Sequence, residues 1–346
     1  MNYVYLRFAF ACGFATTALA DSPYLSNIEQ VTRGFTKAGE GYFSPDEQTI
    51  VFQAESYGYP FYQIYTQELA PDALPRRVSP GRGRTTCSYF SPDGKSILFA
   101  SSHLDPQVDE TERTATAQRE DDGRTGRRRR YQWDFDPHMD LFEVDRDGGP
   151  LQRLTSAVGY DAECAYSPDG EQIVFCSDRD GDPDLYLMDR DGTNVRQLTN
   201  DEGYDGGPFF SPDGQWIVYR TDRLRKDYLQ IHAIGVDGAH DVALTAGESV
   251  NWAPYWHPTL PLIVWAGADH RDHTRRPNYD LWLLLYTVDG GVLRGEGEPI
   301  RITSHAGADV LPVFSPTGTR LMWTSTRSED GSSQLWIADF AWPDGS

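Results

Sequence analysis

Short stretches of alternating hydrophobic and polar residues follow a tight turn at six places along the chain. Each turn has the form Ser-Pro-Asp-Gly or a variant of it, and the turns begin at Ser44, Ser91, Ser167, Ser211, His257 and Ser315. Proline presets φ at the first turn position, and glycine tolerates a positive φ at the exit. The pattern therefore predicts six β-hairpin corners.

The strand after each turn has the same spacing of hydrophobic residues in all six copies. An aromatic residue stands eight positions after the start of each turn, at Phe52, Phe99, Phe175, Tyr219, Trp265 and Trp323. An aliphatic residue stands two positions before it, at Ile50, Ile97, Ile173, Ile217, Ile263 and Leu321. Because alternate residues of a strand share one face, we expect these residues to pack between neighbouring sheets.

Two further strand signatures complete each repeat. A third strand is marked by an aliphatic residue followed by a ring-bearing one, at Ile64-Tyr65, Leu141-Phe142, Leu185-Tyr186, Ile231-His232, Leu281-Trp282 and Leu335-Trp336. A fourth strand ends in a hydroxyl residue, at Thr32, Ser79, Thr155, Thr199, Thr245 and Thr303. Six repeats of four antiparallel strands predict an all-β fold, a six-bladed β-propeller.

The order of these signatures also predicts how the ring closes. The chain begins with a fourth-strand signature at residues 28–32 and ends just after a third-strand one, so the sixth blade lacks its own outer strand. We expect the N-terminal strand to complete the C-terminal blade, which removes two exposed sheet edges.

The repeat resembles that of a known family. The Ser-Pro-Asp-Gly turn, the loop Asp178-Arg179-Asp180-Gly181, the strand and turn from Tyr186 to Gly192, and Gln197-Leu198-Thr199 are similar to the TolB-type propeller repeat. The resemblance covers essentially all of the chain after residue 20. It implies one of the roles such repeats serve: periplasmic scaffolds, accessory domains of peptidases, or sugar lyases. TolB proteins carry an additional α/β domain before the propeller, which we do not expect in this chain.

Composition and charge restrict the fold class, the expected cellular location and the kinds of partner. The 32 Gly, 22 Pro and 13% aromatic residues suit short strands joined by tight turns, and long helices are not expected. Residues 1–20, with Arg7 before an apolar run that ends at Ala20, are typical of a secretory signal, which leaves residues 21–346 as one propeller domain, periplasmic or secreted. The formal charge of −21 disfavours nucleic acid as a partner. No later stretch is apolar enough to span a membrane, and we expect a monomer.

Oxygen-bearing side chains recur near the start of the inner strands. Six residues before each turn stand Ala38, Thr85, Asp161, Asp205, Asn251 and Asp309, and Glu40 and Glu163 follow two residues later. These side chains predict an acidic channel mouth that binds Ca²⁺, another divalent metal or a cationic group, with Asp161, Asp205 and Asp309 as the metal ligands. The alternative is that they hold the blades together, with Arg179, Arg223 and Arg327 either pairing with them or binding the ligand.

Histidines are the main candidates for catalysis. His103, His138, His270, His273 and His305 fall in loops expected on this same face, where imidazoles could bind a transition metal or act as acid and base. The alternative is that they are solvated loop residues. No Gly-x-Ser-x-Gly nucleophile motif is present, and Cys87 and Cys164 could either form a disulfide or pack as thiols.

The second blade carries a long insertion at residues 104–138. It contains four consecutive arginines, 127–130, and ends in a segment that includes Trp133, a candidate ligand-binding residue. An insertion of this length predicts a lid over the mouth, a site for an anionic partner, or a solvated loop with a docked aromatic end.

Three functions are consistent with these features. The first is an exported binding or scaffolding propeller that holds a protein segment, a carbohydrate or another small ligand at the loop face. The second is a metal-assisted polysaccharide lyase acting on uronic-acid glycans, for which histidine and arginine would supply the base and the charge neutraliser. The third is a Tol-Pal-type envelope partner.

Overall fold

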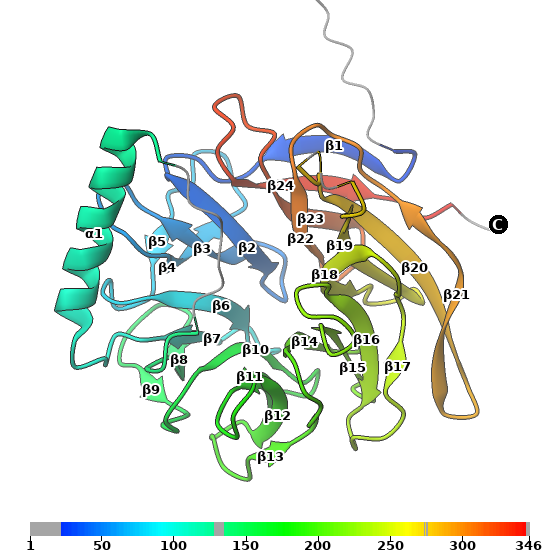
Figure 1. Ribbon diagram of the computed structural model, residues 1–346. Helices are drawn as coiled ribbons and strands as arrows, with labels where there is room; N and C mark the ends of the chain where they lie inside the picture. The colour runs from blue at the N-terminus through cyan, green and yellow to red at the C-terminus, as the bar shows by residue number, and fades with distance from the viewer. Residues whose placement is uncertain (1–21, 128–134, 273, 275, 344–346) are drawn as a thin grey trace, which may run out of the picture.

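The strands form six four-stranded sheets arranged around a central axis (Figure 1). The structure is a computed structural model that describes residues 22–127, 135–272, 274 and 276–343. Every strand pair is antiparallel. The predicted six-bladed β-propeller is therefore confirmed.

Each of the first three blades runs from an inner strand at the axis to a two-residue outer strand. Blade 1 consists of β2 (Lys37–Phe43), β3 (Thr49–Glu55), β4 (Gln63–Glu68) and β5 (Arg76–Arg77). Blade 2 consists of β6 (Thr85–Phe90), β7 (Ser96–Ser101), β8 (Asp140–Asp145) and β9 (Gln152–Arg153). Blade 3 consists of β10 (Asp161–Tyr166), β11 (Gln172–Ser177), β12 (Asp184–Asp189) and β13 (Arg196–Gln197).

The remaining blades follow the same order, except that the last borrows a strand. Blade 4 consists of β14 (Asp205–Phe210), β15 (Trp216–Thr221), β16 (Gln230–Gly235) and β17 (Val242–Ala243). Blade 5 consists of β18 (Ser249–Trp256), β19 (Leu262–Asp269), β20 (Asp280–Asp289) and β21 (Val292–Arg301). Blade 6 consists of β22 (Asp309–Phe314), β23 (Arg320–Ser325), β24 (Gln334–Phe340) and β1 (Leu25–Gln30).

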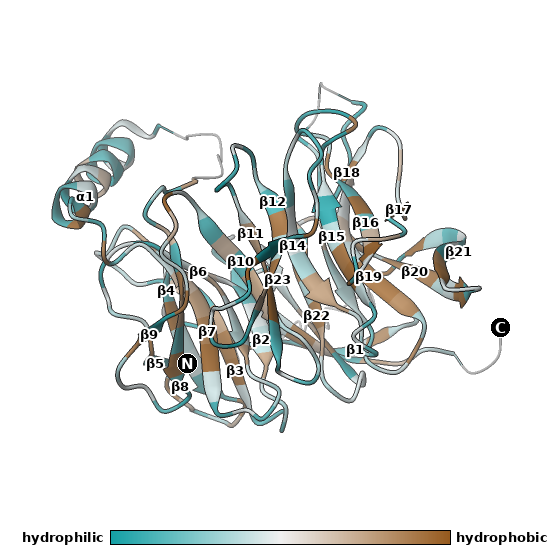
Figure 2. Cartoon of the chain, turned by 90° about the horizontal axis from the view of Figure 1, so that it is seen from below, coloured by the Kyte–Doolittle hydropathy of each residue, from teal (hydrophilic) through white to brown (hydrophobic). Residues whose placement is uncertain are grey.

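The hydrophobic register read from the sequence forms the core. The six aromatic residues of the second strands are at most 2% exposed, and the aliphatic residues two positions earlier are at most 1% exposed. Figure 2 shows the hydrophobic strand segments gathered inside the blades. This register therefore places most of the core between the sheets.

The hydroxyl residue that ends each fourth-strand signature fastens the outer edge of its blade. Its oxygen accepts a hydrogen bond from the backbone N–H of the second residue of the third strand, at 2.8–3.0 Å, in every blade. Because a buried N–H without a partner is costly, each blade needs this oxygen. The hydrogen bond explains why the signature ends in Thr or Ser.

In blade 6 this fastening joins the two ends of the described chain. The Thr32 hydroxyl accepts from the N–H of Leu335 at 2.9 Å and donates to the side chain of Gln334 at 2.9 Å. Strand β1 pairs with β24, with Glu29 opposite Ile337. The predicted closure is confirmed, although the paired strand begins at Leu25 and ends at Gln30 rather than covering residues 28–32.

The expectation of no long helix is wrong. Within the insertion, α1 (Val108–Thr125) spans 18 residues and lies at the outer side of blades 1 and 2 (Figure 1). Its first turn is acidic, ion pairs three residues apart stabilise it, and Gly126 ends it in the left-handed conformation. Glu112 accepts from the N–H of Gly83 at 2.7 Å, and Arg119 pairs with Glu55 at 2.7 Å. Polar contacts therefore dock this helix.

Replacing Thr32 tests the closure. Thr32→Val leaves the N–H of Leu335 and the amide of Gln334 without the hydroxyl, so we expect the free energy of unfolding to fall by about 1–3 kcal/mol. Thr32→Ser keeps the hydroxyl and serves as the control, with a clearly smaller loss. Urea denaturation measures both variants, and equal stability of the Val and Ser variants would contradict the assignment.

Candidate functional site

Each inner strand contains one bulged residue in the left-handed conformation. The pairing between the inner and second strands shifts at this place in all six blades. The residues have φ between 46° and 60° and are Glu40, Cys87, Glu163, Gly207, Ala253 and Leu311. A bulge leaves the extra residue outside the ladder and redirects its side chain. Here one residue from each blade is turned toward the axis.

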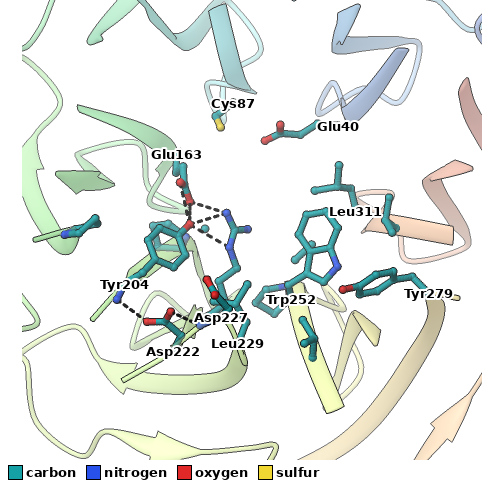
Figure 3. Close-up of a pocket in the computed structure, with 18 of the residues that line it drawn as sticks. Glu40, Cys87, Glu163, Tyr204, Asp222, Asp227, Leu229, Trp252, Tyr279 and Leu311 are labelled. Atoms are coloured by element: carbon teal, nitrogen blue, oxygen red, sulfur yellow. Dashed lines mark hydrogen bonds and ion pairs between the residues drawn. The ribbon is translucent and has the colours of Figure 1, made fainter. Parts of the chain in front are cut away.

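All six bulged residues line a cavity on the axis, whose volume is about 1780 Å³. Figure 3 shows Glu40, Cys87 and Glu163 on one side of this cavity and Trp252 and Tyr279 on the other. The other lining residues come mostly from the loops between second and third strands and from the segments that lead into inner strands. The cavity therefore opens on the face where those loops meet, which we call the loop face.

Aromatic rings close the opposite end of the cavity. They stand two residues before the turn, and rings from blades on opposite sides of the axis touch. Tyr42 lies 5.7 Å from Phe209 between ring centroids, and the hydroxyl groups of Tyr89 and Tyr255 lie 2.9 Å apart. Phe209 and Tyr255 also pack edge to face at 4.9 Å. These four side chains, the aromatic floor, make the cavity a funnel closed at its base.

A buried ion pair occupies one wall. Arg220 donates to Glu163 at 2.8 Å and to the hydroxyl of Tyr204 at 2.7 Å, and that hydroxyl donates to Glu163 at 2.6 Å. The hydroxyl of Tyr160 donates to the same carboxylate at 3.2 Å. Since both charged side chains are at most 8% exposed, each neutralises the other in a water-poor setting.

Glu40 lies across the cavity without a comparable partner. No Lys, Arg or His within the described ranges forms an ion pair with it, and its backbone N–H donates to the hydroxyl of Thr324 at 2.9 Å. Burial raises the pKa of its carboxyl from 4.5 to about 7, although the Cys87 thiol and the charge of Arg220 lower it. Glu40 is therefore poised between its neutral and ionised forms at neutral pH.

The cysteines of this region are thiols. Cys87, Cys164 and Cys176 are buried and free, so Cys87 and Cys164 are not bridged, and Cys164 donates to the backbone carbonyl of Cys87 at 3.4 Å. Burial, together with the carboxylates Glu40 and Glu163, raises the pKa of Cys87 well above its ordinary value. A protonated thiol is a poor nucleophile, so the arrangement does not favour cysteine catalysis.

The aligned aspartates lie within their own blades and do not line the cavity. Each pairs with an arginine of its blade: Asp161 with Arg179 at 2.9 Å, Asp205 with Arg223 at 2.7 Å, and Asp309 with Arg327 at 2.7 Å.

The expected pairing of these acids with arginines is confirmed. Each ion pair holds the residues that follow the second strand against the start of the inner strand in the same blade. A metal or ligand at the three carboxylates stays a prediction.

The other predicted ligand-binding residues are divided between cavity and blade. Asn251 donates to Gln230 at 3.0 Å and accepts from Trp265 at 2.9 Å, so it too belongs to the blade interior. Glu163 and Arg223 line the cavity. Trp133 lies outside the described residues.

The four candidate histidines among the described residues lie on opposite sides of the ring. His103 and His138 belong to blade 2, whereas His270 and His305 belong to the loops of blade 5. His103 contacts the hydroxyl of Ser101 at 2.9 Å, and His270 contacts that of Tyr279 at 3.0 Å.

Of these four histidines, His270 alone lines the cavity. His273 lies outside the described residues. These four candidate histidines therefore do not form one cluster, and a catalytic role for them stays a prediction.

One group of acids has the spacing to hold a metal ion. Among the described residues, Asp180, Asp182 and Asp184 are the group whose carboxylate oxygens lie within 4.8 Å of one another. Asp180 and Asp182 occupy the loop between β11 and β12, Asp184 is the first residue of β12, and Asp182 reaches the cavity lining. Burial raises the pKa of Asp184 to about 7, and its carboxylate accepts from Thr199 at 2.9 Å.

The insertion contributes little to the cavity. No residue of α1 lines it, and Phe135 is the lining residue from the described part of 104–138. Phe135 packs on Tyr160 and Tyr204, with ring centroids 5.1 and 6.0 Å apart. Phe135 is thus docked at the mouth, and a lid formed by the rest of the insertion stays a prediction.

Sequence reasoning missed Arg220 and the aromatic floor. Arg220 stands nine residues after its turn, where blades 2, 3 and 5 have the small residues Ala100, Cys176 and Ala266. A charged residue at a position where three blades have a small side chain, directly beside the buried aromatic register, was the available signal. The floor could have been found from the aromatic residues that stand two positions before four of the six turns.

Breaking the ion pair between Arg220 and Glu163 tests how much it stabilises the cavity wall. Arg220→Met leaves Glu163 buried without its cation, so we expect the free energy of unfolding to fall by about 3–5 kcal/mol. Combining Arg220→Met with Glu163→Gln should cost less than the sum of the two single changes, because the uncompensated charge is then gone. Urea denaturation at pH 7 measures this cycle, and strictly additive losses would refute the pairing.

The raised pKa of Glu40 predicts a pH-dependent cost. The folded protein binds this proton more tightly than the unfolded chain, so stability is lost as the pH rises from about 4.5 to about 7. Glu40→Gln mimics the neutral acid and should be more stable than wild type by up to about 3 kcal/mol at pH 8, with no gain at pH 4. Thermal or urea unfolding at both pH values measures the difference, and a variant equally stable at pH 8 contradicts it.

Comparisons with known proteins agree with the architecture. Residues 133–271 match the family model of the TolB beta propeller domain. A protein of Agrobacterium tumefaciens assigned as TolB has a similar structure, with a TM-score of 0.55, 21% identity and coverage of 88% of this chain and 91% of that one. TolB from Acinetobacter baumannii gives a TM-score of 0.53 and 19% identity, with 89% of this chain matched to 65% of that chain.

An oligogalacturonate lyase from Vibrio parahaemolyticus is similar as well, with a TM-score of 0.51, 14% identity and coverage of 92% of this chain and 98% of that one. At these identities the likeness concerns the fold. Among the described residues no helix is long and apolar enough to cross a membrane. The chain is a six-bladed β-propeller, and its residues 133–271 match the TolB beta propeller domain.

Proposed function

We propose that this chain is an exported binding propeller that holds a protein segment or a small ligand in the cavity of the loop face. The observation that carries the proposal is the preformed funnel of about 1780 Å³ with its aromatic floor. Concave sites that combine aromatic walls with a few charged groups are the usual form of ligand pockets. The wide mouth suits an extended segment as well as a small molecule.

The cavity lining includes hydrophobic side chains that remain accessible to a ligand. Leu224 is 73% exposed and lines the cavity, and Trp252 lies partly exposed in its wall beside Tyr279, with ring centroids 6.1 Å apart. Exposed hydrophobic and aromatic residues around a cavity are typical of binding surfaces. They support a role in recognition.

The expected periplasmic or secreted location and the removal of residues 1–20 are part of this proposal. Two alternatives remain as predictions. A Tol-Pal-type partnership would be one form of protein-segment binding.

A metal-assisted lyase for uronic-acid glycans would need a base and a charge neutraliser at one place, and the candidate histidines among the described residues lie on blades 2 and 5, across the ring from each other. Ultraviolet assays for unsaturated products, with divalent metals supplied, test the lyase.

Obstructing the mouth tests the binding function. Leu224→Glu adds a charge at an exposed lining position without a folding cost, and Trp252→Ala removes an aromatic wall. We expect each to weaken capture of a partner from envelope extract about tenfold or more, because central aromatic contacts dominate binding energy. Leu74→Ala, at an 86% exposed residue in the loop between β4 and β5, is the control and should bind as wild type. Quantitative mass spectrometry of the bound fraction measures capture, and capture unaffected by both mouth variants would overturn the proposal.

A further inference from the structure

We propose that the cavity recognises a primary ammonium group, such as that of a lysine side chain, and that Glu40 is the residue that binds it. This inference rests on the proposed function, since it names the chemistry of the group that the cavity holds. It identifies a specific site at the base of the funnel, which neither the family match nor the similar structures assign.

The backbone at Glu40 fixes its side chain in the cavity. The residue is left-handed, with φ of 46°, although glutamate has no intrinsic preference for that region. Its N–H is held by the hydroxyl of Thr324 from blade 6 at 2.9 Å. The strain of such a conformation is of order 1 kcal/mol or more and persists where the surrounding structure imposes it. Glu40 therefore points into the cavity (Figure 3).

The two bulged glutamates have different electrostatic surroundings. Glu163 is neutralised by Arg220 at 2.8 Å. Glu40 has the hydroxyl of Tyr42 at 3.4 Å and the thiol of Cys87 as its side-chain donors, and no described cation forms an ion pair with it. A buried carboxylate without a cation is costly to ionise. A cation from the ligand would remove this cost.

The surroundings favour an organic cation over a metal ion. Glu40 belongs to no group of three carboxylates, thiols or imidazoles that could hold a metal among the described residues. Tyr42, Phe209 and Tyr255 instead surround the base of the cavity with aromatic rings. Ring faces attract ammonium groups, and the attraction grows when water is excluded. One carboxylate among aromatic rings is the chemistry that recognises a compact ammonium group.

The mouth of the cavity carries further acids. Asp182, Glu202 and Asp227 line it together with basic residues of the loop between β15 and β16. The chain as a whole has a formal charge of −21. A negative protein attracts cationic ligands at long range. Among the described lining residues, Glu40 is the one acidic residue that is buried beside the aromatic floor.

Protonation couples ligand binding to pH. Burial raises the pKa of Glu40 to about 7, and the titratable or charged groups that act on it are Cys87 from β6, Glu163 from β10, Arg220 from β15 and Tyr42 on its own strand. An alkylammonium ion keeps its charge over this range, because its own pKa lies above 10. Binding therefore requires ionised Glu40. Below pH 7 most Glu40 side chains are protonated, so the carboxyl must lose its proton when the ammonium ion binds, and binding is weaker.

The test compares two probes of equal chain length, n-pentylamine and 1-pentanol, by ligand-observed NMR titration of the full mature protein. At pH 8 we expect Glu40→Gln to raise the Kd of pentylamine about tenfold or more and to leave that of pentanol unchanged. Wild type should bind pentylamine about tenfold more weakly at pH 6 than at pH 8, as the ionised fraction of Glu40 falls. Leu74→Ala is the control and should match wild type.

Equal Kd values of pentylamine for wild type and Glu40→Gln, or a Kd independent of pH, would overturn the ammonium site. Glu40→Gln is expected to fold, because it removes a buried charge. If the ammonium site fails while Leu224→Glu still abolishes partner capture, the binding function stands and only its proposed chemistry is lost. If capture is insensitive to Leu224→Glu as well, the cavity is not the binding site.

Discussion

The left-handed bulge in every inner strand is the constraint on which the cavity depends. In a regular inner strand, successive side chains would point to the two faces of the blade, and the backbone would line the axis. At the bulge one residue leaves the ladder and its side chain turns inward. Glycine, at 207, adopts this conformation freely, but the other five blades place residues with a Cβ there at a cost. The ring packing imposes the conformation, so whatever residue occupies the position is presented to the cavity.

This constraint separates the residues that build blades from those available for function. The aligned side chains two residues before the bulge are held inside the blades, as the pairing of Asp309 with Arg327 shows. The bulged positions carry no such task, and they differ from blade to blade in charge and size. Glu163 is compensated by Arg220, whereas Glu40 faces open cavity space. Above pH 7 the ionised Glu40 carboxylate destabilises the folded protein. A residue that is retained although it lowers the stability of the fold is the pattern expected of a functional residue.

Much of the fold was predictable because its rules are local and repeated six times. Turn chemistry, the buried aromatic register and the hydroxyl that Thr32 supplies to Leu335 are all visible as spacings in the sequence. Helix α1 was missed because average composition hides one polar segment whose acidic first turn, charge pairs and C-terminal glycine suit a helix. The site was found only in part. The sequence marks Glu40 and Glu163 as acids near the axis, but nothing in it shows that Arg220, from a second strand, reaches one of them and not the other.

The most direct test of this account is the titration of the Glu40 carboxyl in the ligand-free protein. Infrared difference spectra between wild type and Glu40→Gln isolate the C=O stretch of the protonated acid. The account predicts a band that disappears with a midpoint near pH 7. A midpoint near the ordinary value of 4.5 would mean that Glu40 is solvated or already paired with a cation, and the cavity would then lack the uncompensated acid on which the proposed recognition rests.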